Sequence, residues 1–458
     1  MSLDPDRDAM RRLGADAAGR VADHLAGLSE ARVFAPPSRD VLAKLTDEAL
    51  PLSGAGLDDC LARFFDVLLP HATLVNHPRF FGWVPAPGSF AGALGAFAAS
   101  ASNLFVGTWL GGAIAAQLEV TVLDWLRQAL GLPDRFAGGI LTSGGSLANL
   151  DALAAARARA RARGRTGFRV YVTGEAHYSV GKAARVIGIP RDDVVVVDVD
   201  DAQRLRTASL ARALAQDAAA GREPGVVVVT MGTTTTGAVD PIAEAAALAS
   251  QHGAWLHVDG AFGAALAVLP ERGDLRDALA RADSITLDPH KGLYAPFECG
   301  CLLVTDLPAL RAAFVGDAAY LQDVPRDEVN FFERGPELSR GARAVPLWFV
   351  LRGLGLAAIR DALRADVANA RRAAQALARD PRVSIVTPPS TTVFTFTVAG
   401  GEPRARELLS RIHADGSLLL SSSRVGETFV LRFCVLNHRT DGSEIDRAVA
   451  RIIALLDA

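Results

Sequence analysis

The sequence predicts an α/β protein built on a mostly parallel sheet of seven strands that is flanked by helices. Between residues 81 and 344, short runs rich in Val, Ile and Leu alternate with alanine-rich stretches that are typical of helices. These runs are almost continuously apolar, as expected for strands that are covered on both faces. They lie at residues 139–142, 168–173, 194–199, 225–231, 255–259, 284–287 and 300–305.

The length of 458 residues predicts more than one compact unit. Residues 1–80 have a helical pattern that is interrupted at Pro36, Pro37 and Pro51, and such an arm has little core of its own. We therefore expect this arm to lie on a partner subunit. Residues 81–344 are expected to form the large α/β domain. Residues 345–458 are expected to form a smaller α+β domain, with a long first helix, strands near 393–398 and 429–435, and a last helix from Ser443.

Composition argues against several classes of partner and location. The net charge of -3 gives no electrostatic reason to expect nucleic acid or an acidic membrane as a partner. Four cysteines do not make a disulfide framework in so long a chain, and they suit the reducing cytosol. Cys299 and Cys301 lack a second cluster of cysteine or histidine to complete a zinc site, so we expect no metal. The acidic N-terminus does not resemble a signal peptide, and we expect a cytoplasmic protein.

Residues 80–118 contain no charged side chain, and by length alone they could cross a bilayer. Pro85, Pro87, Asn103 and Gln117 argue against insertion, as does the lack of a basic flank on the C-terminal side. A helix that is apolar on all sides must be covered by something. We therefore expect this segment to lie at the interface of a homodimer and in the wall of the active site.

Lys291 lies where the apolar run 284–287 gives way to Asp-Pro-His-Lys. Burial of an unpaired ammonium group is costly, so a lysine at the end of a buried strand is unusual. One chemical use for it is a Schiff base with an aldehyde, which removes the charge. When this motif is taken alone, a lysine that ends a strand by chance explains it equally well.

Two further polar residues follow apolar runs. Asp259 ends the run 255–259, where a carboxylate can hold the protonated nitrogen of a pyridoxal ring. Taken alone, it is better explained as the cap of the next helix. His177 follows the run 168–173 and can stack on a flat cofactor ring, although a lone histidine more often has a structural role.

A turn rich in glycine and serine, Ser143-Gly144-Gly145-Ser146, connects the run 139–142 to an alanine-rich helix. Glycines let the backbone approach a phosphate closely, and Ser146 and the free amides at the helix start supply hydrogen-bond donors. Turns of this kind are common. This one matches neither the dinucleotide-binding fingerprint nor the Walker pattern, which argues against NAD and ATP.

Together these four motifs resemble those of the pyridoxal-phosphate-dependent group II amino acid decarboxylases, the aromatic-L-amino-acid decarboxylase family. The resemblance covers nearly the whole chain. It includes Asn-His-Pro-Arg-Phe-Phe-Gly at residues 76–82 and Leu-Arg-Phe-Cys-Val-Leu-Asn-His-Arg-Thr at residues 431–440. It implies the aspartate-aminotransferase-like fold called fold type I, an obligate homodimer, and pyridoxal 5'-phosphate as cofactor.

The resemblance also implies roles for single residues. Lys291 would form the Schiff base, Asp259 would pair with the pyridine nitrogen, and His177 would lie over the ring. Aromatic-acid members of the family usually carry asparagine where Asp288 stands, and a carboxylate in contact with phosphate would be repulsive. Further cofactor contacts are implied for Gly145, Ser146, Thr234, Ala261, Asp288 and His290, and substrate contacts for Trp83 and Ala86.

The expected reaction is decarboxylation of an L-amino acid to the amine and CO2, directed by how the substrate carboxylate is oriented. The implied pocket wall has no obvious cation or carboxylate for a charged side chain, which favours an aromatic or apolar substrate. A lyase, aminotransferase or desulfurase reaction on the same fold is an alternative, in which Arg432 would bind a substrate carboxylate. A non-catalytic scaffold that keeps the fold is a third hypothesis.

One segment departs from the family pattern. Family members carry a tyrosine on a mobile loop that helps to protonate the carbanion after CO2 leaves. The corresponding residues 327–335 contain Phe331 and Phe332 and no tyrosine. In this family, phenylalanine at that position is associated with aldehyde synthases, which consume oxygen after decarboxylation. A decarboxylation-dependent aldehyde synthase is therefore a further alternative.

Overall fold

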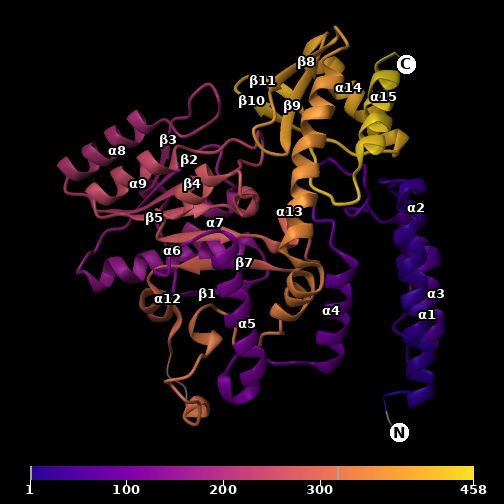
Figure 1. Ribbon diagram of the computed structural model, residues 1–458, viewed down its shortest axis with the longest axis horizontal. Helices are drawn as coiled ribbons and strands as arrows, with labels where there is room; N and C mark the ends of the chain where they lie inside the picture. Colours follow the sequence, from indigo (N-terminus) through magenta and orange to yellow (C-terminus); the bar gives the residue numbers. More distant parts are fainter. Residues whose placement is uncertain (1–2, 317–318, 458) are drawn as a thin grey trace.

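The structure is a computed structural model that describes residues 3–316 and 319–457 (Figure 1). Its large sheet has the strand order β1-β7-β6-β5-β4-β2-β3. β2 pairs in parallel with β3 and β4, β5 pairs in parallel with β4 and β6, and β7 is antiparallel to both of its neighbours. The predicted mostly parallel seven-stranded sheet is confirmed. The strands are β1 (Gly138–Thr142), β2 (Arg169–Thr173), β3 (Val194–Val197), β4 (Pro224–Thr230), β5 (Trp255–Asp259), β6 (Ser284–Leu287) and β7 (Gly300–Val304).

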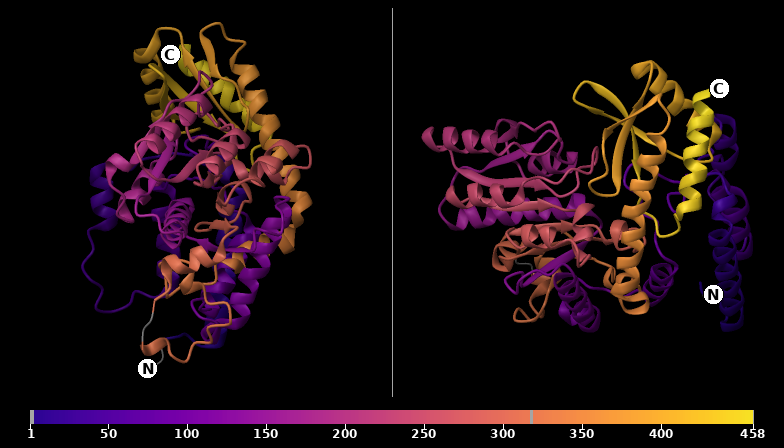
Figure 2. Two further views of the ribbon diagram at one scale, coloured as in Figure 1. Left: turned by 90° about the vertical axis from the view of Figure 1, so that its left-hand side faces the viewer. Right: turned by 45° about the horizontal axis from the view of Figure 1, so that its top comes forward.

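Helices lie on both sides of this sheet, which explains why its strands are apolar throughout (Figures 1 and 2). All seven residues of β4 are buried. Each predicted run forms a strand whose ends differ from the prediction by at most two residues. The helices that follow β1 and the later strands of this sheet are α6 (Gly145–Ala162), α7 (Tyr178–Val186), α8 (Thr207–Ala219), α9 (Ile242–Gln251), α10 (Gly273–Leu279), α11 (Pro289–Gly292) and α12 (Leu307–Phe314).

The C-terminal part begins with the long helix α13 (Ala344–Leu377), which bends at Gly355, where φ is 81°. A four-stranded antiparallel sheet in the order β10-β11-β9-β8 follows. The predicted long helix, two strands and last helix correspond to α13, β9, β11 and α15, whereas β8, β10 and α14 were not predicted. The bounds are β8 (Val383–Thr387), β9 (Val393–Val398), α14 (Gly401–Asp415), β10 (Ser421–Val425), β11 (Thr428–Cys434) and α15 (Gly442–Asp457).

The N-terminal arm contains α1 (Arg7–Ala26), α2 (Arg39–Thr46) and α3 (Leu57–Ala62). In the described chain, none of these three helices contributes a buried residue. α1 runs along the outside of the molecule, on the side opposite to β3 (Figure 1). These three helices therefore form no core of their own, and the contact of the arm with a partner subunit stays a prediction.

The charge-free segment 80–118 contains α4 (Phe90–Ser102) and the first half of α5 (Trp109–Ala129). One side of α4 packs against α13. Elsewhere the segment leaves large apolar side chains exposed, with Phe97 at 67%, Leu110 at 67% and Ile114 at 79%. Within residues 3–316 and 319–457, no helix has the length and apolar character needed to cross a membrane.

A buried ion pair connects α5 to the segment before α13, and both of its partners contact β1. The carboxylate of Glu119 on α5 pairs with Arg340, and both side chains are fully buried. Arg340 also donates to the carbonyl oxygen of Leu141 (2.6 Å), while Glu119 accepts the N–H of Leu141 (2.9 Å). Leu141 lies in β1, two residues before the glycine- and serine-rich turn, so these contacts hold the start of that turn in place.

Candidate active site

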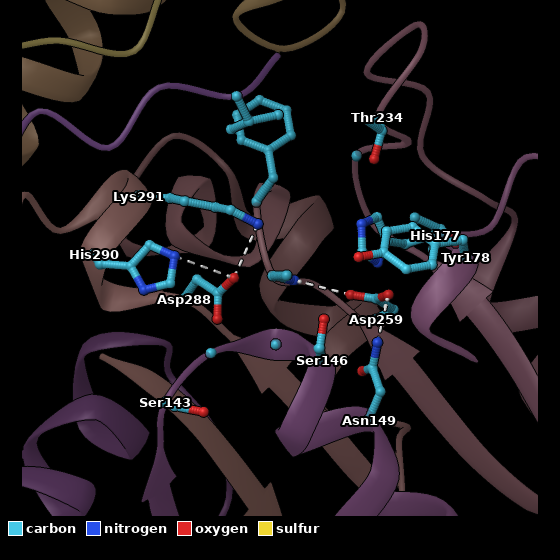
Figure 3. A pocket seen from close by; sticks show the side chains of 17 residues that line it. Ser143, Ser146, Asn149, His177, Tyr178, Thr234, Asp259, Asp288, His290 and Lys291 are labelled. Carbon is cyan, nitrogen blue, oxygen red and sulfur yellow. Dashed lines mark hydrogen bonds and ion pairs between the residues drawn. The ribbon is translucent and has the colours of Figure 1, made fainter. Parts of the chain in front are cut away.

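A cavity of about 380 Å³ lies beyond the carboxyl ends of β1, β2, β4, β5 and β6 (Figure 3). Ligands of open α/β sheets bind at this edge. All nine residues that the resemblance assigned to the cofactor line this one cavity. They are Gly145, Ser146, His177, Thr234, Asp259, Ala261, Asp288, His290 and Lys291.

Lys291 reaches the cavity from the short helix α11, which starts directly after β6. Its Nζ atom lies 2.9 Å from Oδ2 of Asp288, and its side chain is 23% exposed. Burial by itself would lower the pKa of Lys291, but the charge and hydrogen bond of Asp288 outweigh that effect and raise the pKa. Without an aldehyde bound, Lys291 is therefore an ammonium ion with its own counter-ion.

Asp259 is the last residue of β5 and is buried. One carboxylate oxygen accepts a hydrogen bond from Nδ2 of Asn149 (2.9 Å), and the other accepts the N–H of Ala261 (3.2 Å). Both partners donate, which matches the acceptor-only oxygens of a carboxylate. A carboxylate in this state matches the protonated nitrogen of a pyridine ring.

His177 is the N-cap of α7, and its Nδ1 atom accepts the backbone N–H of Ser179 (3.4 Å). Its ring centroid lies 4.5 Å from that of Tyr178. Burial lowers the pKa of His177, although the nearby charge of Asp259 opposes the effect. At neutral pH the ring is therefore an uncharged imidazole, which suits contact with a flat aromatic cofactor.

The start of α6 provides donors for a phosphate. Gly144 caps this 18-residue helix without a side-chain hydrogen bond, so first-turn amides remain available for an anion. A Cβ atom at Gly145 would lie 3.0 Å from the Cβ of Ala261 and 3.1 Å from Oδ2 of Asp288, so glycine suits this close approach. This cradle fits the phosphate of the implied cofactor. The carboxylate of Asp288 faces Lys291, and its phosphate contact stays a prediction.

Sequence reasoning missed several polar residues at this site. Asn149 and Tyr178 line the cavity, and Ser179, His257 and Thr286 lie behind it in contact with Asn149 or His177. Asn149 follows Ser146 by three residues on α6, so both lie on the same side of that helix. This spacing could have predicted that Asn149 lies beside Ser146 at the site.

The two residues expected in the substrate wall, Trp83 and Ala86, are not among the described residues that line the cavity. Trp83 is 57% exposed and its ring packs near Phe80, while Ala86 is buried. Val84, by contrast, does line the cavity. The substrate contacts of Trp83 and Ala86 therefore stay predictions.

Arg432 is not free to bind a substrate carboxylate as the alternative hypothesis required. It is 2% exposed, and its guanidinium group donates to the carbonyl oxygens of Trp83, Thr234 and Thr235 and to Oγ of Ser421. These contacts join the small sheet to the loop that carries Thr234. Arg432 thus holds the rim of the cavity together.

Phe331 and Phe332 also have packing roles. Phe331 is fully buried, with the guanidinium carbons of Arg334 and Arg340 at 4.8 Å and 4.9 Å from its ring centroid. Phe332 packs with Leu321 and other apolar side chains. In the part of the chain that the structure describes, neither phenylalanine lines the cavity.

Residues 40–399 match the family described as "Pyridoxal-dependent decarboxylase conserved domain". The chain is 32% identical to the aromatic-L-amino-acid decarboxylase of Bacillus atrophaeus, over 100% of this chain and 97% of that protein. It is 30% identical to the 4-hydroxyphenylacetaldehyde synthase of Rhodiola rosea, over 88% and 86% of the two proteins. The crystal structure of Oryza sativa TDC with PLP and tryptamine superposes with a TM-score of 0.94 and 28% identity, over 100% and 99% of the two chains.

The structural role of Arg432 leads to a prediction about stability. We expect Arg432→Lys to destabilise the protein by about 1–3 kcal/mol for each buried carbonyl oxygen that it leaves unpaired. Thermal unfolding measures the effect. Arg424→Lys is the matched control, because Arg424 lies on the same small sheet with an exposed ion pair to Glu402, worth less than about 1 kcal/mol. Equal unfolding temperatures for the two variants would contradict the assigned role.

Proposed function

The chain belongs to the pyridoxal-dependent decarboxylase family, and on this premise we propose that it converts an aromatic or apolar L-amino acid to the amine and CO2. The family establishes that the chain is a pyridoxal-phosphate-dependent amino acid decarboxylase. One observation carries the finer proposal: the cavity that contains Lys291, Asp259 and His177 offers no second cation for a side-chain carboxylate. Among its described lining residues, Lys291 is the one with a full positive charge at neutral pH.

The character of the cavity wall supports the same class of substrate. Val84, Phe262 and Tyr178 present apolar or aromatic surface to the cavity. A glutamate-like substrate would have to bury its side-chain carboxylate without a partner, which is unfavourable. The similarity to an aromatic-L-amino-acid decarboxylase agrees with an aromatic or apolar side chain.

We assign the chemical roles to the residues that surround the cofactor. When bound, pyridoxal phosphate supplies an aldehyde that joins to an amine and a ring that accepts the electrons released as CO2 leaves. The amine of Lys291 would hold the cofactor through its aldehyde. Asp259 would pair with the ring nitrogen, and His177 and Ala261 would contact the ring. Gly145 and Ser146 would hold the phosphate.

Release of CO2 tests the proposed function. We expect the purified protein, loaded with pyridoxal phosphate, to release CO2 from at least one aromatic L-amino acid. Lys291→Ala should lower turnover by at least about 10²–10⁴-fold, because both cofactor attachment and proton transfer need the amine. Lys182→Ala, which alters an exposed lysine on α7, is the matched control and should retain full turnover. Absence of CO2 from all aromatic and apolar amino acids would contradict the proposal.

An aldehyde product is the second candidate. It is supported by the absence of tyrosine from residues 327–335 and by the similarity to a 4-hydroxyphenylacetaldehyde synthase. In its favour, no residue from 327–335 is among the described residues that line the cavity, so this segment supplies no acidic proton there. Tyr178 lines the cavity with a hydroxyl group, which argues for the amine instead.

The dependence of turnover on oxygen distinguishes the two candidate functions. For an amine-forming enzyme we expect equal turnover in air and under nitrogen, with no peroxide. Tyr178→Phe should then raise the aldehyde fraction if the hydroxyl of Tyr178 protonates the carbanion, because a positioned general acid is worth about 10²–10⁴-fold. Product analysis for amine, aldehyde and peroxide measures both effects. Aldehyde and peroxide as the main products of the parent protein in air would establish the second candidate.

We also propose that the protein is a cytosolic homodimer. Large exposed apolar side chains on α4 and α5 are typical of an interface. In a homodimer with two-fold symmetry, the same apolar surface of a second copy would pack against them. All four cysteines are free thiols, which suits a reducing compartment.

Sedimentation tests the dimer. We expect the parent protein to sediment as a dimer and Phe97→Glu to shift it toward the monomer, because a charge would be buried in the interface. Val196→Glu is the matched control. Val196 is 68% exposed but lies on β3, at the far edge of the large sheet. A soluble, active monomer of the parent would overturn the proposal.

A further inference from the structure

Asn149 is a buried side chain whose whole hydrogen-bonding capacity is used at the cavity. It is 1% exposed. Its Nδ2 donates to Oδ2 of Asp259 (2.9 Å) and to Oγ of Ser179 (3.0 Å), and the first contact is drawn in Figure 3. Its Oδ1 lies 2.7 Å from Oγ1 of Thr286 and 3.0 Å from Nε2 of His257. An asparagine side chain has two donors and two acceptor sites, so nothing is left over.

The proton positions behind Asn149 follow from an atom that can only accept. Nδ2 of Asn149 donates to Asp259, so it is Oδ1 that faces Nε2 of His257, and Nε2 must be the donor. Nδ1 of His257 then accepts the hydroxyl proton of Ser284 (2.8 Å), while Oγ of Ser284 accepts Nε1–H of Trp255 (2.7 Å). His257 is neutral, since burial lowers its pKa to about 4. Its proton therefore lies on Nε2, from which it is donated to Oδ1 of Asn149.

A second branch runs from Asn149 to His177. Oγ of Ser179 accepts from Asn149 and lies 2.7 Å from Nδ1 of His177, so its hydroxyl proton is free to point to that nitrogen. The backbone N–H of Ser179 points to the same nitrogen (3.4 Å). Two donors converge on Nδ1, so this atom carries no proton, and the neutral ring keeps its proton on Nε2.

We propose that Asn149 is a positioning residue that sets the proton arrangement of two cavity groups at once. It donates to the carboxylate of Asp259 and, through Ser179, keeps His177 as the Nε2–H tautomer. The consequence is that Asp259 offers an acceptor to a protonated ring nitrogen while His177 offers an N–H donor to the bound cofactor or substrate. The inference rests on the proposed function, in which both groups face the cofactor.

Orientation of the amide is what makes this role specific. If the Asn149 amide were reversed, its oxygen would face the Asp259 carboxylate and its NH2 group would face Nε2–H of His257, so two contacts would become repulsive. The ionisable groups that surround the network are Asp259 and His257 on β5, His177 before α7, and Asp288 and Lys291 after β6.

The first test reads the tautomers directly. Selective ¹⁵N-histidine NMR of the full-length protein loaded with pyridoxal phosphate is recorded at pH 7, and the signals are assigned with His177→Gln and His257→Gln. We expect both histidines to be neutral with the proton on Nε2. A proton on Nδ1 of either ring would overturn the proposal. This measurement needs no variant of Asn149 and no turnover.

The second test separates hydrogen bonding from space filling, with cofactor affinity as the readout. Asn149→Ala should weaken pyridoxal phosphate binding by about 10- to 100-fold at all pH values between 5 and 9, because a bond to a charged group is lost. Asn149→Asp preserves the side-chain volume but can donate only when protonated. We therefore expect its affinity to approach the parent value at pH 5 and to fall below that of Asn149→Ala at pH 9, where two carboxylates face each other.

Asn369→Ala is the matched control, since Asn369 is a buried asparagine on α13 that donates to the carbonyl oxygen of Thr440. It should leave cofactor affinity unchanged. A pH-independent Asn149→Asp variant that binds better than Asn149→Ala would show a packing role and overturn the proposal. If the parent binds the cofactor with the expected tautomers but releases no CO2, the proposed function fails while this inference stands.

Discussion

The site is organised around a cation that is held beside its own counter-ion. The ammonium of Lys291 lies 2.9 Å from Asp288, whose side chain is 3% exposed, and neither group is well solvated there. Because a charge in such a place needs a partner, Asp288 pairs with Lys291, which leaves the amides at the start of α6 as the expected donors for a phosphate. The neighbouring histidines add no charge, since burial lowers the pKa of both His177 and His290. Among its described lining residues, the cavity thus carries one localised positive charge, at the amine that we expect to attach the cofactor.

Sheet topology places the other groups around this amine. β5 and β6 are parallel neighbours, with Asp259 in register with Thr286, so Asp259 and the residues after β6 lie at the same edge. The antiparallel strand β7 lies between β6 and β1, yet β1 still points its carboxyl end to this edge and delivers the glycine- and serine-rich turn. The buried pair of Glu119 with Arg340 then holds the start of that turn.

The parts of the fold and the site that could be predicted are those whose sequence signal lies within one short segment. The continuous apolar runs predicted the seven strands, and the polar residues at their ends singled out Lys291, Asp259 and His177, which the structure places around one cavity. β10 was missed because its sequence, Ser-Ser-Ser-Arg-Val, has no apolar alternation, and it is only partly buried. The role of Arg432 and the network of Asn149 depend on partners that are distant in sequence, 198 and 110 residues away for Thr234 and Asp259. No spacing rule for a single chain segment reveals such contacts.

The attachment of the cofactor to Lys291 is the central claim, and the composition of the chain makes it directly measurable. The sequence contains three lysines, Lys44, Lys182 and Lys291, and the first two are exposed. Borohydride reduction of the protein loaded with pyridoxal phosphate, followed by peptide mapping, would fix the cofactor to the lysine that holds it. The account predicts a label on the peptide that contains Lys291 and none on the other two. A label on Lys44 or Lys182 in place of Lys291 would contradict it.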